Sequence, residues 1–251
     1  MPIQETEAVL IRSYPLSESS VIGVFYTRDF GKVRAVARGV RRPKSKFRGQ
    51  LDLLNRGHLI YTEKANRDLQ TVRDFDLIDN FEQIKTDFDR FSYACYFAEL
   101  IDAIESDGAE NPEIFSLLMR TFCYFEMVGD LQLFARTFEL HLLEITGYSP
   151  QFSRCSNCGN ILTSQDTVLY YQDQTSEIVC ATCVTPHLVR ISRGSCELMK
   201  RLQQSDFGQL ARIRASRQNY REMKFVLSAL INFHTQRRLK SLKFLDLVET
   251  S

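Results

Sequence analysis

The chain has 251 residues and contains no tryptophan, only four histidines and no long hydrophobic run. Its longest apolar stretches are a few residues, whereas a membrane-spanning helix needs roughly 20, so we expect no transmembrane segment and no membrane partner. The N-terminal stretch MPIQETEAVL lacks the basic start and apolar region of a secretory signal. We therefore expect a cytoplasmic protein whose thiols stay reduced, which makes disulfides an unlikely use of its seven cysteines.

The chain also has almost no net charge, because its 32 Lys+Arg and 31 Asp+Glu give a formal net charge of +1. That sum argues against a nucleic-acid-binding protein, in which a basic excess is the usual footprint. The distribution argues the other way. Net charge is +4 over residues 1–80, −9 over 81–150 and +6 over 151–251, so the neutrality is a cancellation between blocks. This asymmetry predicts an anionic partner for the two ends of the chain.

The sequence also lacks the residue patterns that common catalytic sites require. The four histidines, at positions 58, 141, 187 and 234, are scattered, and the acidic residues of 81–150 show no paired spacing. A nuclease would need clustered carboxylates or histidines to hold its metals. No GxxxxGK[ST] motif occurs, which argues against ATP-driven work. We therefore expect a protein that is not an enzyme, and a nuclease is the less favoured alternative.

The first 80 residues have the pattern of a small β-barrel. A short apolar run near 8–11 and runs with β-branched and aromatic residues near 21–27, 57–62 and 69–77 predict four strands. Alternation of basic and small apolar residues over 32–37 predicts a fifth, half-buried strand with a basic outer face. The turn Asp29–Phe30–Gly31 predicts a hairpin between the second and third strands, since glycine supplies the positive φ that such turns need. Five short strands in about 80 residues are typical of a small barrel.

The rest of the chain predicts helices interrupted by a small insert. Apolar residues recur at three- and four-residue spacing from Phe81 to Ile104, which is a helical stripe. Asn111–Pro112 and Asp130 are helix starts, Gly147 is a stop, and helical patterns resume near 192–202 and 220–239. We predict an α+β multidomain protein: a barrel over 1–80, a helical domain over 81–150 and 187–251, and an insert over 151–186.

Four cysteines in the insert form two CxxC pairs, Cys155–Cys158 and Cys180–Cys183, separated by 21 residues. Two such turns brought together give the tetrahedral four-sulfur shell that Zn²⁺ favours. A closed shell of four protein ligands predicts one structural zinc ion rather than a catalytic one. The alternatives are a redox or unmetallated thiol pair and a ligand role for His187. The remaining cysteines, 95, 123 and 196, lie on apolar helix faces and are predicted core residues.

A basic segment follows the second strand. Residues 28–48 carry nine Lys+Arg and one acid, a net charge of +8 in 21 residues. We predict that eight of these residues bind DNA phosphates: Lys32, Arg34, Arg38, Arg41, Arg42, Lys44, Lys46 and Arg48. Nearby aromatic side chains, Phe25, Tyr26, Phe30 and Phe47, are candidates for stacking on bases, although strand alternation places either Phe25 or Tyr26 in the core. Contact of about six basic residues with single-stranded phosphates predicts a salt slope near −4.

A second basic set lies toward the C-terminus and comprises Arg212, Arg214, Arg217, Arg221, Lys224, Arg237, Arg238, Lys240 and Lys243. Arg217, Arg221 and Lys224 have helical spacing and could form one stripe. Basic helix faces are common on soluble proteins, so this set is the weaker candidate for a nucleic-acid or protein contact.

Several stretches, in the same order along nearly the whole chain, resemble the bacterial RecO family of DNA-repair and recombination-mediator proteins. They are Glu7–Leu10, Phe25–Thr27, Val36–Ser45, Gly49–Leu51, Arg136–Leu143, Gly147–Pro150, Cys155–Gly159 and Leu239–Lys243. The Ala-Arg-Gly-x-Arg-Arg run combined with the downstream CxxC is specific. The chain departs from the commoner pattern at Ser176–Val179, where glycines are frequent in the family.

The resemblance implies an N-terminal OB-fold barrel followed by an all-helical domain that carries a zinc-ribbon insert. It also implies binding of single- and double-stranded DNA, annealing of complementary strands, and loading of RecA together with RecR and single-stranded-DNA-binding protein, at the nucleoid. In this family the acidic, apolar tail of that last partner docks on the helical domain. Arg136 matches that region and is a candidate contact for a tail carboxylate. The alternatives are a zinc-ribbon adaptor in transcription or translation and, less favoured, a nuclease.

Overall fold

The computed structural model describes residues 2–64, 67–163, 165–166, 168–172, 175, 177–236, 239–242 and 244–245. The chain forms two compact units, one comprising Met1–Glu126 with Leu239–Ser251 and the other Met127–Arg238. Among the described helices, none combines the length and the apolar character that crossing a membrane requires.

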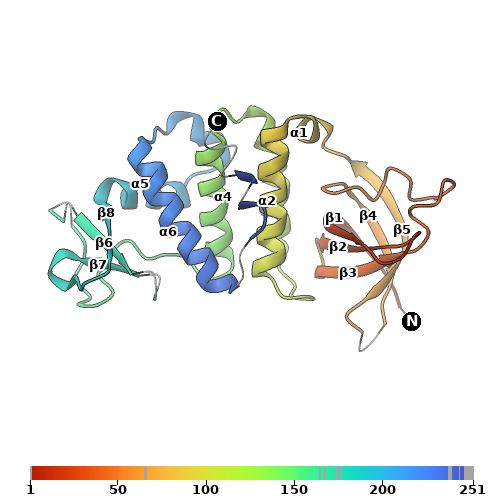
Figure 1. Ribbon diagram of the computed structural model, residues 1–251, viewed down its shortest axis with the longest axis horizontal. Coiled ribbons are helices and arrows are strands. Elements are labelled where there is room, and N and C mark those ends of the chain that lie inside the picture. Colours follow the sequence, from red (N-terminus) through yellow and green to blue (C-terminus); the bar gives the residue numbers. More distant parts are fainter. Residues whose placement is uncertain are drawn as a thin grey trace. The chain divides into compact units, whose positions relative to one another are not determined.

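The first unit begins with a barrel, drawn in red to orange in Figure 1. Its strands are hydrogen-bonded in the closed order β1-β2-β3-β5-β4. They are β1 (Ile3–Pro15), β2 (Val21–Thr27), β3 (Gly31–Ala37), β4 (Arg56–Thr62) and β5 (Gln70–Asp79). All neighbours are antiparallel except β3 and β5, which pair in parallel at Ala35↔Gln70 and Val36↔Thr71. The five predicted strands are confirmed, in a barrel of the kind that the resemblance implies.

The turn between β2 and β3 forms the predicted hairpin. Gly31 has a φ of 59°, and the Thr27 hydroxyl accepts a hydrogen bond from Phe30 N and donates one to Gly31 O. Inside the barrel, Leu10, Phe25, Leu59 and Phe75 are almost wholly buried and form the centre of its core.

Three helices follow the barrel: α1 (Glu82–Thr86), α2 (Phe88–Ile104) and α3 (Pro112–Tyr124). The predicted stripe from Phe81 thus forms two helices, and Asp87 caps the second by accepting a hydrogen bond from Arg90 N. Pro112 opens α3 as predicted, but the Asn111 side chain makes no capping hydrogen bond. These helices belong to the same compact unit as the barrel, which comprises Met1–Glu126 with Leu239–Ser251.

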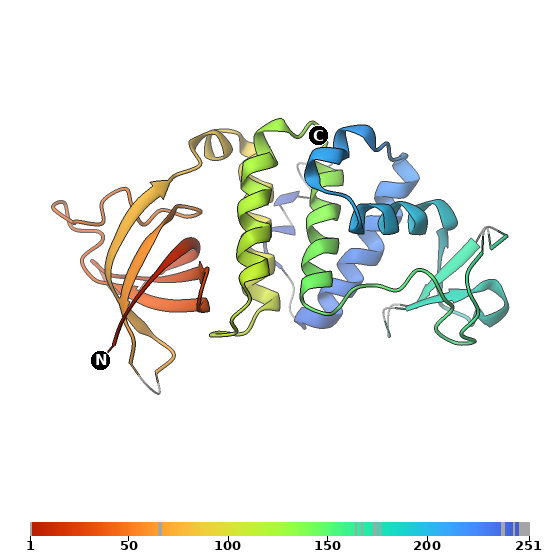
Figure 2. The same cartoon turned by 180° about the vertical axis from the view of Figure 1, so that it is seen from behind.

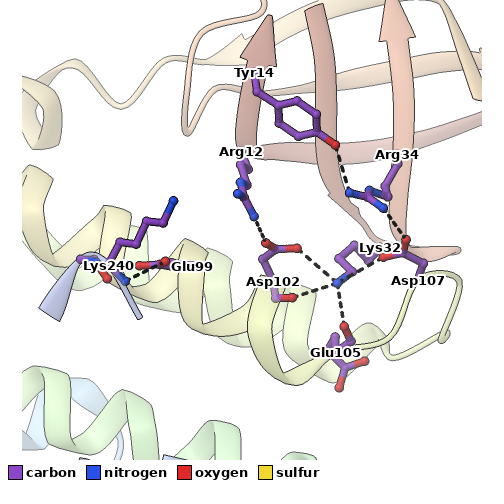
Figure 3. A network of polar contacts seen from close by, with 10 residues as sticks. Arg12, Tyr14, Lys32, Arg34, Glu99, Asp102, Glu105, Asp107 and Lys240 are labelled. Atoms are coloured by element: carbon purple, nitrogen blue, oxygen red, sulfur yellow. Dashed lines mark hydrogen bonds and ion pairs between the residues drawn. The ribbon is translucent and has the colours of Figure 1, made fainter. Parts of the chain in front are cut away.

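A C-terminal segment returns to this unit and lies against α2. Leu239 and Leu245 are buried, and the Glu99 carboxylate accepts hydrogen bonds from the backbone N–H groups of Lys240 (3.0 Å) and Ser241 (2.8 Å). Figure 3 draws the Lys240 contact. Burial by itself would raise the pKa of the Glu99 carboxyl, but hydrogen bonds from Ser241 and Lys240 more than offset it and lower that pKa below its ordinary 4.5.

A depressed carboxylate pKa stabilises the fold above the ordinary pKa, and this contribution is lost as the pH falls through the native value. Glu99→Gln is therefore expected to lower the thermal midpoint at pH 6 and to have a smaller effect at pH 3.5. Thermal denaturation of both proteins at the two pH values measures this. An equal loss at pH 6 and pH 3.5 would contradict the role of the ionised carboxylate.

The second unit has a helical core of α4 (Leu131–Ile145), α5 (Arg193–Gln203) and α6 (Arg217–Thr235). Asp130 caps α4 as predicted, and Gly147, with a φ of 79°, follows its end. Cys196 is buried in this core as predicted. In the first unit, by contrast, Cys95 is half-buried and Cys123 is exposed, so the prediction for Cys123 is wrong.

A three-stranded sheet lies between α4 and α5 in the sequence, and Figure 2 shows the segment that leads to it from α4. Its order is β7-β6-β8, with β6 (Val168–Gln172), β7 (Glu177–Cys180) and β8 (Val189–Ser192). Strand β8 begins at Val189. The sheet therefore extends beyond the predicted insert boundary at residue 186.

Candidate nucleic-acid interface and metal centre

The segment 38–50 between β3 and β4, which we call the basic loop, is a series of turns attached to the barrel. Gly39 and Gly49 both have a φ of 73°, which only glycine adopts readily. Phe47 is buried in the barrel core, and the Asn55 side chain donates hydrogen bonds to the Gly49 and Gln50 carbonyls. The loop is thus held in place while its charged side chains face outward.

Six predicted DNA-binding residues lie on this loop, and all are exposed: Arg38, Arg41, Arg42, Lys44, Lys46 and Arg48. Lys46 pairs with Asp74 at 3.1 Å. For the other five, no ion pair with an acidic residue is found within the described part of the chain. Five cations on one anchored loop, without neutralising acids, form a surface that attracts polyanions.

Lys32 contradicts its predicted role as a phosphate contact. Its side chain is only 7% exposed, and its Nζ donates to Asp102 O (2.9 Å), Asp102 Oδ1 (3.2 Å) and Glu105 O (2.7 Å). Asp107 Oδ1 lies 3.2 Å from the same Nζ. Figure 3 shows these contacts at the end of α2. The last carbonyls of a helix lack partners within it, so Lys32 satisfies them from outside and compensates the negative helix end.

Removal of the Lys32 ammonium is expected to destabilise the first unit strongly, because the buried Asp102 would lose one ion-pair partner and keep Arg12, and the carbonyls at the end of α2 would lose their donor. Breaking a buried ion pair on one side typically costs about 3–5 kcal/mol. We expect that loss for Lys32→Met in urea denaturation. The control Lys44→Met removes an exposed lysine and should change stability by less than about 0.5 kcal/mol. Similar stabilities of the two variants would show that the Lys32 network is dispensable.

Arg34 lies on the same strand and is half-exposed. Its guanidinium donates to the Tyr14 hydroxyl at 3.0 Å and pairs with Asp107 at 3.6 Å (Figure 3). A phosphate would have to compete with Asp107 for this side chain. The structure thus separates the eight predicted residues into Lys32 and Arg34, which contact the α2–α3 region, and six on the basic loop.

Most of the predicted stacking aromatics are inaccessible. Phe25, Tyr26 and Phe47 are all buried, so their prediction as base-stacking groups is wrong. Alternation predicts that only one of Phe25 and Tyr26 faces the core. Both are buried, for different reasons. Phe25 lies in the barrel core, whereas the Tyr26 hydroxyl donates a hydrogen bond to Asn111 O at the start of α3. Phe30 remains partly accessible.

The four cysteines of the two CxxC pairs meet in the second unit, with all four Sγ atoms within 4.8 Å of one another. Sγ of Cys158 and Sγ of Cys180 are 3.9 Å apart. A tetrahedral site with Zn–S bonds of about 2.3 Å requires sulfur–sulfur distances of about 3.8 Å. The four residues can therefore hold a metal ion, and the residue types and spacing fit a closed four-sulfur shell.

Local structure closes the turn of the first pair and favours the thiolate form of Cys180. Gly159 follows the first pair with a φ of 72°, and its N–H donates to Cys155 O at 2.9 Å to close the turn. The Thr182 hydroxyl, 2.9 Å from Sγ of Cys180, is the largest of the causes that lower the pKa of this thiol to about 6. The thiolate is the form that binds metals. His187 is not a member of the ligand group found among the described residues.

Arg136 contradicts its predicted role as a surface contact for a partner tail. Its side chain is 3% exposed within α4, and it pairs with the fully buried Glu139 at 3.2 Å. A residue in this position cannot reach a carboxylate of a docking peptide, and it contributes instead to the interior of the second unit.

The second basic set is partly visible. Arg212, Arg214, Arg217 and Arg221 are exposed in the second unit, and Lys224 is half-buried. Lys240 is exposed beside Glu99 in the first unit. Arg237, Arg238 and Lys243 lie outside the described residues.

Sequence reasoning missed another feature, the contact of residues 105–111 with the barrel, because nothing in the local pattern of a loop indicates what it covers.

The first unit carries a five-stranded barrel with an exposed basic loop, and the second carries a ribbon whose four cysteines can hold a metal ion, which defines the class as an α+β multidomain protein. Residues 1–81 match the family model described as Recombination protein O N terminal, and residues 85–243 match Recombination protein O C terminal. The chain belongs to the RecO family of DNA repair proteins, as the sequence resemblance predicts.

Curated relatives agree over the full length. A DNA repair protein RecO from Symbiobacterium thermophilum is 32% identical over 255 residues, which cover 100% of both chains. The DNA repair protein RecO of Pelotomaculum thermopropionicum is 29% identical over 98% of this chain and 94% of its own. That of Syntrophus aciditrophicus is 30% identical over 98% of this chain and 96% of its own.

Proposed function

We propose that this protein is a non-enzymatic recombination mediator that binds single- and double-stranded DNA through its basic loop and anneals complementary strands. The observation that carries this proposal is the set of five exposed cations, Arg38, Arg41, Arg42, Lys44 and Arg48, on an anchored loop. Membership of a DNA repair family supports it.

Annealing breaks no covalent bond, so its physical requirement is neutralisation. Two polyanionic strands repel each other unless cations reduce the charge on their phosphates. The bases must stay accessible for pairing, so most contacts should be made to the backbone. Long exposed Arg and Lys side chains on a loop meet this requirement, because they contact phosphates without enclosing the strand.

The proposal includes the partners that the family resemblance implies. The protein would act with RecR and with single-stranded-DNA-binding protein to load RecA on a single strand, at the nucleoid. The tail of the single-strand-binding protein would dock on the helical domain at a site other than the buried Arg136.

We also propose that the four cysteines hold one Zn²⁺ with a structural role. Cys155, Cys158, Cys180 and Cys183 would close its coordination shell, which leaves no open position for a substrate. The ion would link the turn that precedes the ribbon to the end of β7, in a segment with little core of its own.

Incubation of the full-length protein with end-labelled complementary strands separates the candidate functions. Faster duplex formation with strands of unchanged length is the result that we expect. Shortened strands would instead indicate a nuclease. Binding to one duplex sequence without annealing would indicate an adaptor in transcription or translation.

A further inference from the structure

The connection between α2 and α3 lies directly on the barrel in the first unit. We call residues 105–111 the docked segment. Gly108 N donates to Lys32 O at 2.9 Å, and a Cβ added at Gly31 would stand 1.8 Å from Ala109 O. Only glycine at position 31 permits this approach. With the Lys32 ammonium and the Tyr26 hydroxyl, these contacts attach the docked segment along its length.

The docked segment forms one wall of a pocket of about 280 Å³. The start of β3 and the β4–β5 connection form the other walls. Residues that face this space include Phe30, Arg34, Tyr61, Arg67, Asp68 and Glu110. Because residues from outside the barrel complete it, the pocket is not a property of the five strands alone.

One wall of the pocket is aromatic. Phe30 is half-buried and meets the buried Tyr61 edge to face, with ring centroids 6.2 Å apart and an interplanar angle of 86°. A partly accessible ring supported from behind by a second ring is a surface on which a nucleobase stacks. Phe30 is also the one predicted stacking aromatic that the structure leaves accessible.

The charged groups of the pocket favour a base over a phosphate. Four carboxylates face it, from Glu63, Asp68, Asp107 and Glu110, which would repel an anion. Of the three cations that line it, Lys32 is fully engaged at the end of α2, Arg34 is paired with Asp107 and Arg67 is exposed, so the four carboxylates outnumber the cations. Carboxylates accept hydrogen bonds from the exocyclic amino groups of bases, as they do from cytosine N4.

We propose that this pocket holds one base of a single strand and prefers bases with an exocyclic amino group to thymine. Phe30 stacks on the base, and the exposed carboxylates of Asp68 and Glu110 accept hydrogen bonds from its amino group. The strand β3 connects the pocket to the basic loop, and the four residue-to-residue steps from Arg34 to Arg38 span about 13 Å, within reach of a few nucleotides. The inference rests on the proposed binding of single-stranded DNA.

The test compares the affinities of the full-length protein for fluorescent oligo-dC and oligo-dT of equal length at pH 7.5 and equal salt. We expect the wild-type protein to bind oligo-dC several-fold more tightly. Phe30→Leu should weaken oligo-dC binding about fivefold or more through loss of base stacking, with the salt slope unchanged. Phe88→Leu, which changes an exposed phenylalanine outside the pocket, is the matched control and should bind like the wild type.

Asp68→Asn combined with Glu110→Gln alters only exposed side chains and tests the hydrogen bonds without touching the barrel core. We expect this variant to bind oligo-dC and oligo-dT equally. Equal affinities in the wild type, or an unchanged preference in this variant, would overturn the pocket. Salt-dependent binding without base preference would leave the proposed function intact, whereas salt-independent or absent binding would refute the proposed function itself.

Discussion

Replacement by glutamine of the five basic-loop residues that form no ion pair within the described part of the chain, Arg38, Arg41, Arg42, Lys44 and Arg48, is expected to weaken single-stranded DNA binding about 3,000-fold at 0.1 M salt. Each phosphate contact contributes about 0.7 to the slope of log affinity against log salt, so five contacts account for about 3.5 decades at this concentration. Fluorescence anisotropy with a labelled oligonucleotide measures the loss. Because these side chains are exposed, we expect the thermal midpoint to change little.

A pair of double variants with equal charge change separates the loop from net charge. Arg41→Gln with Arg42→Gln should weaken binding about 25-fold, by the same rule for two contacts. Arg120→Gln with Arg190→Gln removes two exposed cations outside the loop and should have at most a few-fold effect. Equal losses in the two variants would mean that overall charge, and not the basic loop, determines binding.

Metal removal is expected to unfold the ribbon and leave the barrel intact. Binding of zinc by small four-ligand sites contributes about 10–16 kcal/mol, which is then the folding free energy of the segment around it. A strong chelator, or Cys180→Ser, should therefore make residues 151–192 sensitive to protease. Most of the far-UV circular dichroism should persist, because the helices and the barrel do not contain the ligands.

Cys123→Ser is the matched control for this experiment, because Cys123 is exposed on α3 and lies outside the cysteine cluster. It should show neither proteolysis of the ribbon nor loss of metal. Measurement of zinc content by mass spectrometry links the two effects. A ribbon that stays protected from protease after the metal has been removed would contradict the structural role.

The sequence predicts the barrel well because strand formation is a local property. Each of the five strands contains β-branched residues, all but β3 also contain an aromatic residue, and the Gly31 turn fixes one hairpin register directly. The cysteine cluster is equally predictable, since CxxC spacing already places two sulfurs together. In contrast, the sequence does not predict β8, because Val189–Ser192 is short and its strand structure depends on pairing with β6.

The wrong predictions concern side chains that another part of the protein covers. Alternation along β3 correctly places Lys32 and Arg34 outside the barrel core. It does not indicate whether the outer face of the strand contacts solvent or the end of a helix. Arg136 fails for the same reason, because Glu139, one helical turn later, makes its burial possible. Two acids of the block 81–150, Asp102 and Asp107, form ion pairs with these barrel cations, so part of the −9 charge offsets basic residues that the sequence assigns to DNA.

The most direct test of the central claim is the salt dependence of single-stranded DNA binding by the unmodified protein. Eight basic residues near the barrel were candidates, and a slope near −4 is the expectation from the sequence for six contacts. The structure reduces the unpaired loop cations to five, so the account predicts a slope of log affinity against log salt of about −3.5. A slope near zero would contradict it, because DNA would then be held without its phosphates meeting the basic loop.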